Sequence, residues 1–105
     1  MFIVTVLFKI HAAHWHDFLS SMYRNAATSL YVETGCRQFD VCEGEAGQFE
    51  VFLYEVYDTQ TDFAVHLDAS HFLQFNAETA VWVADKKVQT YTRVAAAPTT
   101  STHLE

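Results

Sequence analysis

The segment Gln48–Tyr57, QFEVFLYEVY, decides the fold of this 105-residue chain. Its apolar side chains alternate between two faces, which is typical of a β-strand. One face carries Phe49, Val51, Leu53 and Tyr57, and the other carries Phe52, Tyr54 and Val56. Helices cover only one face of such a sheet, so the second face, extended by Ile3, Leu7 and Tyr91, needs another partner. We therefore expect two copies of the chain to pack sheet against sheet as a homodimer.

The periodicity on either side of this segment predicts the remaining elements. Two-residue alternation predicts strands over Phe2–Ile10, Cys36–Glu43 and Lys86–Val94. Spacings of three and four predict helices over His14–Val32, Gln60–Asp68 and His71–Ala84. The resulting order is β-α-β-β-α-α-β, the ferredoxin-like split βαβ arrangement. We expect an α+β fold with its helices on one face of a four-stranded antiparallel sheet.

The ends of these elements carry further signals. Thr59 and Asp62 have the spacing of a capping box at the start of the second helix. On the first helix, the pattern places Tyr23, Leu30 and Tyr31 on the buried face and Asn25 on the solvent face. One domain is predicted over residues 1–94. The Ala- and Thr-rich segment 95–105 is predicted to be a disordered tail, whose end, Leu104-Glu105, resembles a cloning remnant.

Charge and composition narrow the class of partner. The chain has 13 acidic and six basic residues, a net charge of −7, which makes nucleic acid a poor partner. No apolar run approaches the ~20 residues of a membrane helix, and we expect no membrane association. Cys36 and Cys42 lie about 20 Å apart if they share one strand at ~3.3 Å per residue, too far for a disulfide. They are predicted to be reduced thiols of a cytoplasmic protein.

Glu55 and His66 form the strongest candidate constellation. Glu55 is expected on the strand face beneath the helices, and His66 lies beside the buried stripe of the second helix. A carboxylate and an imidazole meeting in an apolar pocket form a general acid–base pair whose pKa values burial shifts. Tyr57 and Arg37 are further candidate members of this constellation. The alternative is a structural hydrogen bond in a satisfied core.

Other chemistries have weaker support. His11, His14 and His16 lack the spacing of a metal-binding motif, so we expect no metal. Only three glycines are present, and no phosphate-binding or serine-hydrolase motif occurs. Aromatic residues, including Phe72, Phe75 and Trp82, suit either a core or a pocket for a planar organic ligand.

Two stretches resemble one known family. Glu33–Val41 (ETGCRQFDV) and Phe52–Asp58 (FLYEVYD), followed by Phe63, His66 and Ser70-His71-Phe72, resemble the antibiotic biosynthesis monooxygenase domain family. The resemblance spans residues 2–94. The family that it indicates includes quinol monooxygenases and an autoinducer-processing enzyme. It implies a dimeric α+β barrel, in which two ferredoxin-like units share their sheets. The axial histidine of haem-degrading relatives has no counterpart near Asn76, so the resemblance implies no haem and no other cofactor.

The resemblance also implies a reaction. Family members oxygenate phenols or quinols with O₂ alone, after the substrate loses a proton. The implied catalytic residues are His66 as base, Glu55 as its orienting partner and Tyr57 as a donor to the substrate oxygen. The expected substrate-binding residues are Arg37, Phe39, His71 and Phe75. Two alternatives remain open: an isomerase of a small keto compound that uses the same acid–base pair, and a non-catalytic ligand-binding dimer module.

Overall fold

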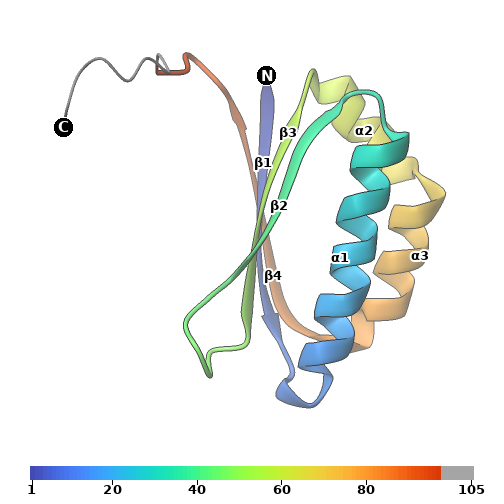
Figure 1. Ribbon diagram of the computed structural model, residues 1–105, viewed down its shortest axis with the longest axis vertical. Helices are drawn as coiled ribbons and strands as arrows, with labels where there is room; N and C mark the ends of the chain where they lie inside the picture. Colours follow the sequence, from blue (N-terminus) through green and yellow to red (C-terminus); the bar gives the residue numbers. More distant parts are fainter. Residues whose placement is uncertain (98–105) are drawn as a thin grey trace.

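The computed structural model describes residues 1–97 (Figure 1). The larger part of the predicted tail, including Leu104-Glu105, lies outside the described residues. The elements, in chain order, are β1 (Phe2–Ile10), the 3₁₀ turn η1 (Ala12–His14), α1 (Trp15–Val32), β2 (Cys36–Glu43), β3 (Glu50–Tyr57), α2 (Gln60–Asp68), α3 (Ser70–Thr79), the 3₁₀ turn η2 (Ala80–Trp82) and β4 (Val83–Thr92). Among these residues, no helix combines the length and apolarity that a membrane crossing requires.

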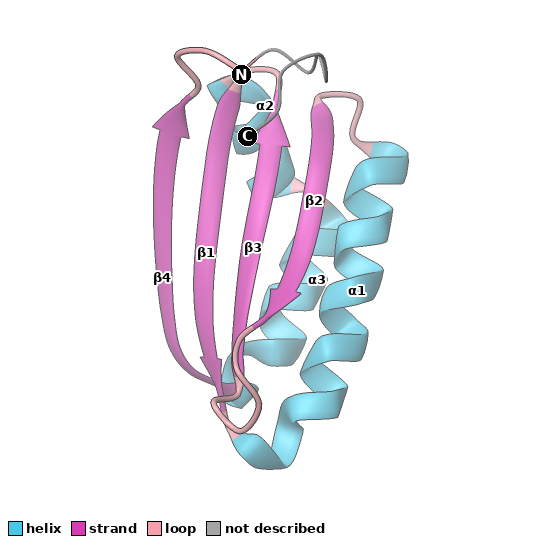
Figure 2. Ribbon diagram, turned by 60° about the vertical axis from the view of Figure 1, so that its left-hand side comes forward, coloured by secondary structure: helices cyan, strands magenta, loops and turns pink. Residues whose placement is uncertain are grey.

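The four strands form one antiparallel sheet in the order β2-β3-β1-β4. All three helices lie on the same side of it, so the molecule has two layers (Figures 1 and 2). Helix α1 lies toward the β2 edge, whereas β4 forms the opposite edge (Figure 2). The predicted ferredoxin-like α+β architecture is therefore confirmed, with β1 and β3 at the centre of the sheet.

Several predicted boundaries move by a few residues. The capping box forms as expected. The Thr59 hydroxyl accepts a hydrogen bond from the backbone N–H of Asp62, and the Asp62 carboxylate accepts one from the backbone N–H of Thr59. The last predicted helix ends early, at Thr79, and β4 begins at Val83 rather than Lys86 because Val83 already pairs with Ile10. Strand β3 begins at Glu50, since Phe49 has a left-handed φ of 56°.

The buried face of α1 differs from the predicted one. Tyr23 and Tyr31 are exposed, whereas the buried face consists of Phe18, Ser21, Met22, Asn25, Ala26 and Ser29. The reason is that α1 packs against α3 as well as the sheet. The Ser21 hydroxyl donates a hydrogen bond to the carboxylate of Glu78 on α3. The Oγ atom of Ser29 lies 3.2 Å from Nε2 of His71, at the start of that helix. Apolar periodicity alone does not reveal this polar interface between helices.

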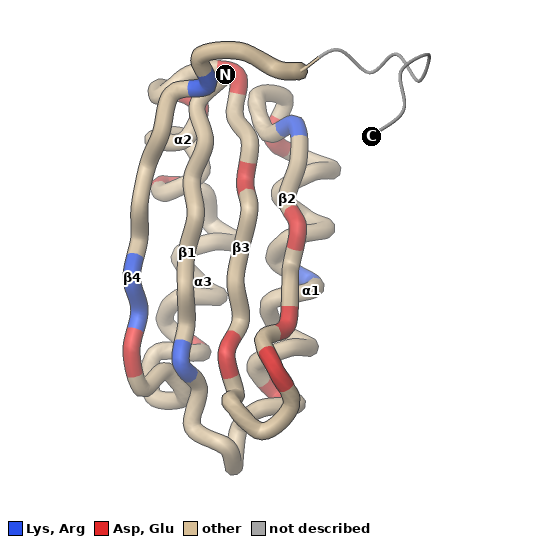
Figure 3. The backbone as a smooth tube through the Cα atoms, turned by 90° about the vertical axis from the view of Figure 1, so that its left-hand side faces the viewer, with Lys and Arg blue, Asp and Glu red and all other residues tan. Residues whose placement is uncertain are grey.

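Within residues 1–97, no helix covers the opposite face of the sheet (Figure 3), and large apolar side chains are partly exposed there. Leu7, Phe52 and Tyr91 are 41%, 39% and 49% exposed. The expectation that Ile3 and Val56 are also uncovered is wrong, because both are buried within one chain. These two residues pair across β1 and β3 at the centre of the sheet, and Ile3 also pairs with Tyr91 of β4.

Candidate functional site

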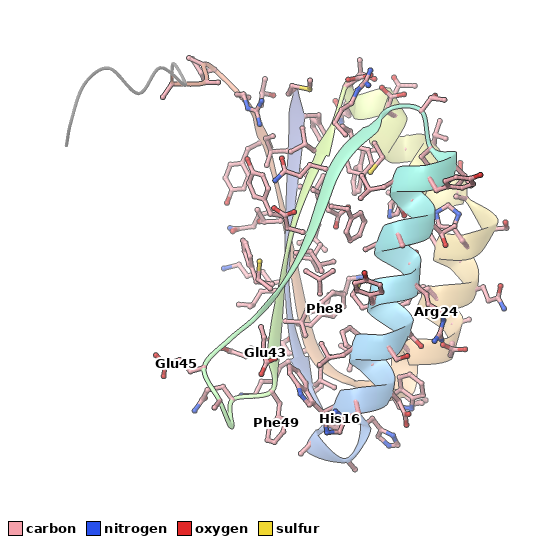
Figure 4. The ribbon with its side chains drawn as sticks, viewed as in Figure 1. Phe8, His16, Arg24, Glu43, Glu45 and Phe49 are labelled. Atoms are coloured by element: carbon pink, nitrogen blue, oxygen red, sulfur yellow. The ribbon has the colours of Figure 1, made fainter. Side chains whose placement is uncertain are left out.

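An apolar cavity of about 210 Å³ lies between the helices and the sheet. Residues from every helix and strand contribute to its wall. They are Val6, Phe8, Met22, Asn25, Phe39, Leu53, Glu55, Phe63, His66, Leu67, Phe72, Phe75, Lys86 and Val88. Figure 4 shows the labelled Phe8 in the space between the sheet and α1. The few polar groups in an otherwise aromatic and aliphatic wall give the cavity the character of a small-molecule site.

Four of the predicted site residues meet at this cavity, and three do not. Glu55, His66, Phe39 and Phe75 line it. Tyr57 is fully buried beside it. Arg37 lies on the outer surface, where it forms an ion pair with Asp58 at 2.7 Å. His71 borders a separate, more polar groove between α1 and α3.

Glu55 is not the hydrogen-bond partner of His66, so its expected role as the residue that orients His66 is wrong. His66 Nδ1 lies 2.9 Å from Oε2 of Glu33, the residue that directly follows α1. Glu55 instead accepts a hydrogen bond of 2.6 Å from the hydroxyl of Tyr57, two residues away on the same face of β3. The carboxylate that orients His66 therefore comes from the end of a helix.

The chain brings Glu33 to His66 through a close approach of two turns. Gly35 lies between α1 and β2, and a Cβ atom there would collide with the carboxyl group of Asp62. Asp62 belongs to the capping box that starts α2, the helix that carries His66. The absence of a side chain at Gly35 therefore lets the end of α1 meet the start of α2.

The Glu33 carboxylate accepts hydrogen bonds from two histidines. In addition to His66, His71 Nε2 lies 2.6 Å from Glu33 Oε2. The side chains of Glu33 and His66 are 7% and 3% exposed. A carboxylate beside Nδ1 favours the tautomer with the proton on that nitrogen, which leaves the Nε2 lone pair of His66 free to accept. This is the arrangement in which a carboxylate orients a general base.

Burial sets the protonation of His66. Desolvation lowers the pKa of His66 below its usual 6.5, although the hydrogen bond and the charge of Glu33 oppose this shift. The imidazole is therefore neutral at pH 7. A neutral imidazole whose Nδ1–H is already donated acts as a base through Nε2.

Glu55 titrates near neutrality. Burial raises the pKa of its carboxyl group from 4.5 to about 7, and the charge of Glu33 adds to this increase. The hydrogen bond from Tyr57 and the positive charge of Lys86 act in the opposite direction. Burial also raises the pKa of Tyr57 well above its ordinary range, so its hydroxyl remains a donor. Glu55 can thus hold or release a proton at the cavity wall near pH 7.

Lys86 supplies the cationic group at the cavity. Its Nζ atom lies 5.4 Å from the centre of the Phe8 ring and 5.9 Å from that of Phe72. The surrounding rings desolvate the ammonium group, and this lowers its pKa. A cation held over aromatic rings beside an apolar cavity can stabilise an anion formed there.

Sequence reasoning missed three residues of this site. Glu33 lay within the stretch that carried the family resemblance but received no role. The helical periodicity predicts that Asn25 faces solvent, and the strand periodicity predicts only that Lys86 begins the last strand. For Glu33, its position two residues before Gly35 was the available signal. Nothing in the periodicity indicated that Asn25 or Lys86 faces the cavity.

Glu33, His66 and His71 also satisfy a distance criterion for metal binding. One ligand atom from each lies within 4.8 Å of the others, and two imidazoles with a carboxylate suit several transition metals. In this structure the same atoms satisfy one another through hydrogen bonds, and we assign no metal to them.

Comparison with known proteins identifies the family of this chain. The fold is that of a small α+β domain with a largely apolar cavity between its helices and its sheet. The model of the antibiotic biosynthesis monooxygenase family matches residues 1–78. The chain belongs to this family, which confirms the resemblance seen in the sequence. At the level of the family, its class of activity is that of a monooxygenase.

Solved structures share the fold of this chain. A "putative antibiotic biosynthesis monooxygenase" from Nitrosomonas europaea has 25% sequence identity and a TM-score of 0.85, covering 90% of this chain and 100% of that one. A protein of the same description from Deinococcus radiodurans shares 20% identity with a TM-score of 0.85, over 95% and 99% of the two chains. A Mycobacterium tuberculosis protein shares 19% identity with a TM-score of 0.82, over 92% and 98%. No curated protein matches the chain.

Proposed function

We propose that this chain is a cofactor-independent monooxygenase of a small hydroxylated aromatic compound or quinol. The observation that carries the proposal is the position of His66, which lines an aromatic cavity while Glu33 holds its Nδ1. The monooxygenase class comes from the family, and the substrate class that the resemblance implies agrees with the aromatic lining of this cavity. His66, Glu33, Glu55 and Lys86 are the residues that act on the substrate or on its base.

In the first step, a substrate hydroxyl donates its proton to Nε2 of His66. The resulting oxyanion is stabilised by the imidazolium and by the ammonium group of Lys86, which lines the same cavity. The electron-rich anion then transfers an electron to O₂, and recombination forms a carbon–oxygen bond. The largely apolar wall of the cavity limits the access of water to the anion.

The remaining steps balance without an external reductant. The substrate hydroperoxide loses its ring hydrogen as a proton while the O–O bond breaks. One oxygen atom stays on the ring as a carbonyl, and the other leaves as water with the two protons released by the substrate. The substrate supplies all the electrons for O₂ reduction. Glu55, with a pKa of about 7, is suited to deliver a proton to the departing oxygen.

The size of the cavity limits the substrate. An engineered cavity of about 150 Å³ holds one benzene molecule. A volume of about 210 Å³ therefore suits one aromatic ring with substituents, or two fused rings after small side-chain movements. The rings of Phe39 and Phe75 provide apolar contacts to such a substrate.

We further propose that the protein acts as a cytoplasmic homodimer. The partly exposed Leu7, Phe52 and Tyr91 on the open sheet face supply the apolar contact area. Face-to-face packing of two such sheets gives the α+β barrel that the family resemblance implies. The free thiols of Cys36 and Cys42 suit a reducing compartment.

Oxygen uptake tests the proposed reaction. Protein treated with a chelator is mixed with one- and two-ring quinols while dissolved O₂ is recorded. We expect uptake above the buffer rate with one O₂ consumed per quinol, and His66→Gln should return uptake to the buffer rate. Uptake that equals the buffer rate for all quinols, or that is unchanged in His66→Gln, excludes the proposed reaction.

An isomerase is the second candidate, because Glu55, whose pKa is about 7, and His66, whose pKa burial lowers, line one cavity. Two such groups can move a proton between carbon and oxygen of a keto compound. That reaction continues under argon, whereas the proposed oxygenation stops. If neither reaction occurs but ligands bind, the chain is a binding module.

A further inference from the structure

The side chain of Asn25 is a polar group without a partner at the cavity wall. Asn25 lies on α1 and is 5% exposed. Its Oδ1 atom is buried and accepts no hydrogen bond from any residue within 1–97. The residue lines the same cavity as His66 and Glu55. A buried carbonyl oxygen that has lost its water without gaining a donor destabilises the folded protein.

The surroundings of Asn25 are mixed. Ser21 and Ser29, one turn away on either side, are buried and polar, and Asn25 also borders the groove between α1 and α3. Met22 and Ala26, its neighbours on the inner face of α1, are apolar and buried. Leucine has the same number of side-chain heavy atoms as asparagine and a similarly branched end, and it suits a helix better. A polar group that weakens the fold at such a position is typical of a residue retained for binding.

We propose that Asn25 recognises a second oxygen substituent on the aromatic substrate. This inference rests on the proposed function, in which the first hydroxyl faces His66. Asn25 and His66 come from different helices, α1 and α2, that border one cavity. A ring with two oxygen substituents engages both residues at once.

The amide suits either oxidation state of that substituent. Rotation about χ2 exchanges the carbonyl oxygen and the NH₂ group of Asn25 with little change of shape. The carbonyl accepts from a hydroxyl, and the NH₂ group donates to a carbonyl. The preferred substrates are therefore dioxygenated arenes, with 1,4-diols or hydroxyketones favoured over simple phenols. A site built to hydrogen-bond such a group discriminates strongly against an analogue that lacks it.

Ligand binding under argon tests the inference without turnover. The probes are hydroquinone against phenol, and 1,4-dihydroxynaphthalene against 1-naphthol, measured by calorimetry. Wild-type protein should bind each diol about 10-fold more tightly than its mono-hydroxy analogue, which corresponds to one net hydrogen bond. Asn25→Leu should reduce this ratio to about 1–2. Asn76→Leu makes the same exchange on the exposed surface of α3 and should keep the wild-type ratio.

Thermal unfolding without ligand provides an independent readout. Asn25→Leu should raise the melting temperature, because it removes the unpaired amide, whereas Asn76→Leu should not. Asn25→Met provides a second, unbranched replacement. A wild-type ratio near 1, an unchanged ratio in Asn25→Leu, or unfolding of both replacements overturns the inference. An Asn25-dependent preference for diols in a protein that consumes no O₂ keeps this inference and rejects the proposed reaction.

Discussion

Glu33, at the end of α1, holds His66 of α2 through a hydrogen bond of 2.9 Å between Oε2 and Nδ1. Both side chains are almost completely buried, and His66 also borders the cavity. This pairing fixes which nitrogen of His66 carries the proton. It therefore connects the turn between α1 and β2 to the proposed chemistry.

Replacement of Glu33 by glutamine should reduce the reaction rate more than substrate binding. The amide of Glu33→Gln presents its carbonyl or its NH₂ group to His66 and no longer enforces one tautomer. We expect kcat for quinol-dependent O₂ uptake to fall at least about 100-fold, as in triads whose orienting carboxylate becomes an amide. KM should change less than threefold.

Glu45→Gln is the matched control for this change. Glu45 is exposed in the loop between β2 and β3, away from the helices (Figure 4). Its replacement should leave kcat within twofold of the wild type. A Glu33→Gln protein that retains full kcat contradicts the orienting role of Glu33.

The acid limb of the pH–rate profile should reflect a histidine with a lowered pKa. Burial lowers the pKa of His66, so the neutral, active form is present below pH 6.5. We expect kcat/KM to rise with pH through a midpoint below 6.5, measured by initial O₂ uptake between pH 4.5 and 8. Comparison with Glu55→Gln separates this midpoint from any step near pH 7 that belongs to Glu55. A midpoint above 7 in both proteins rules out a neutral His66 as the base.

The stability of the protein should decrease as pH rises from 4.5 to 7 because of Glu55. The folded protein binds the Glu55 proton up to a pKa of about 7, whereas the unfolded chain releases it near 4.5. Stability from this group is thus complete below pH 4.5 and is lost as pH rises through 7. The shift corresponds to about 3 kcal/mol in the free energy of unfolding.

Urea unfolding at several pH values measures this effect. Glu55→Gln should remove the pH-dependent decrease relative to wild type, and Glu45→Gln should retain it. If wild type and Glu55→Gln show parallel pH profiles, Glu55 is ionised at pH 5 and its proposed proton-donor role is wrong.

A charge on the open sheet face should separate the proposed dimer. Phe52 lies on that face beside Leu7 of β1 and Cys42 of β2. Phe52→Lys should convert a dimer into a monomer in light scattering at micromolar concentration. Val81→Lys, at an exposed position of η2 on the helical side, should remain dimeric. A monomeric wild-type protein, or a Phe52→Lys protein that stays dimeric, contradicts the predicted interface.

Local sequence signals were sufficient for the elements and insufficient for the site. Alternation predicted β1 and β2 with their observed bounds, and Thr59 with Asp62 predicted the start of α2. These features depend on neighbours in the chain. The partner of His66 depends instead on how closely α1 approaches α2, which Gly35 permits but no periodicity encodes.

The error at α1 has the same origin. Apolar periodicity placed Tyr23 inside and Asn25 outside, whereas the structure has the reverse. Ser21 and Ser29 form the contact with α3 through hydrogen bonds, so the helix turns a partly polar face inward. A polar residue that is buried for binding, as we propose for Asn25, contradicts the pattern on which sequence prediction relies.

The ionisation state of a bound substrate tests the central claim most directly. A two-ring dihydroxyarene whose anion absorbs at a longer wavelength than its neutral form is mixed with the protein under argon at pH 7. We predict that wild-type protein produces the absorption of the anion on binding, and that His66→Gln binds the same compound in its neutral form. Absorption of the neutral form in the wild-type complex at saturation would show that His66 does not remove the proton, and it would contradict the account.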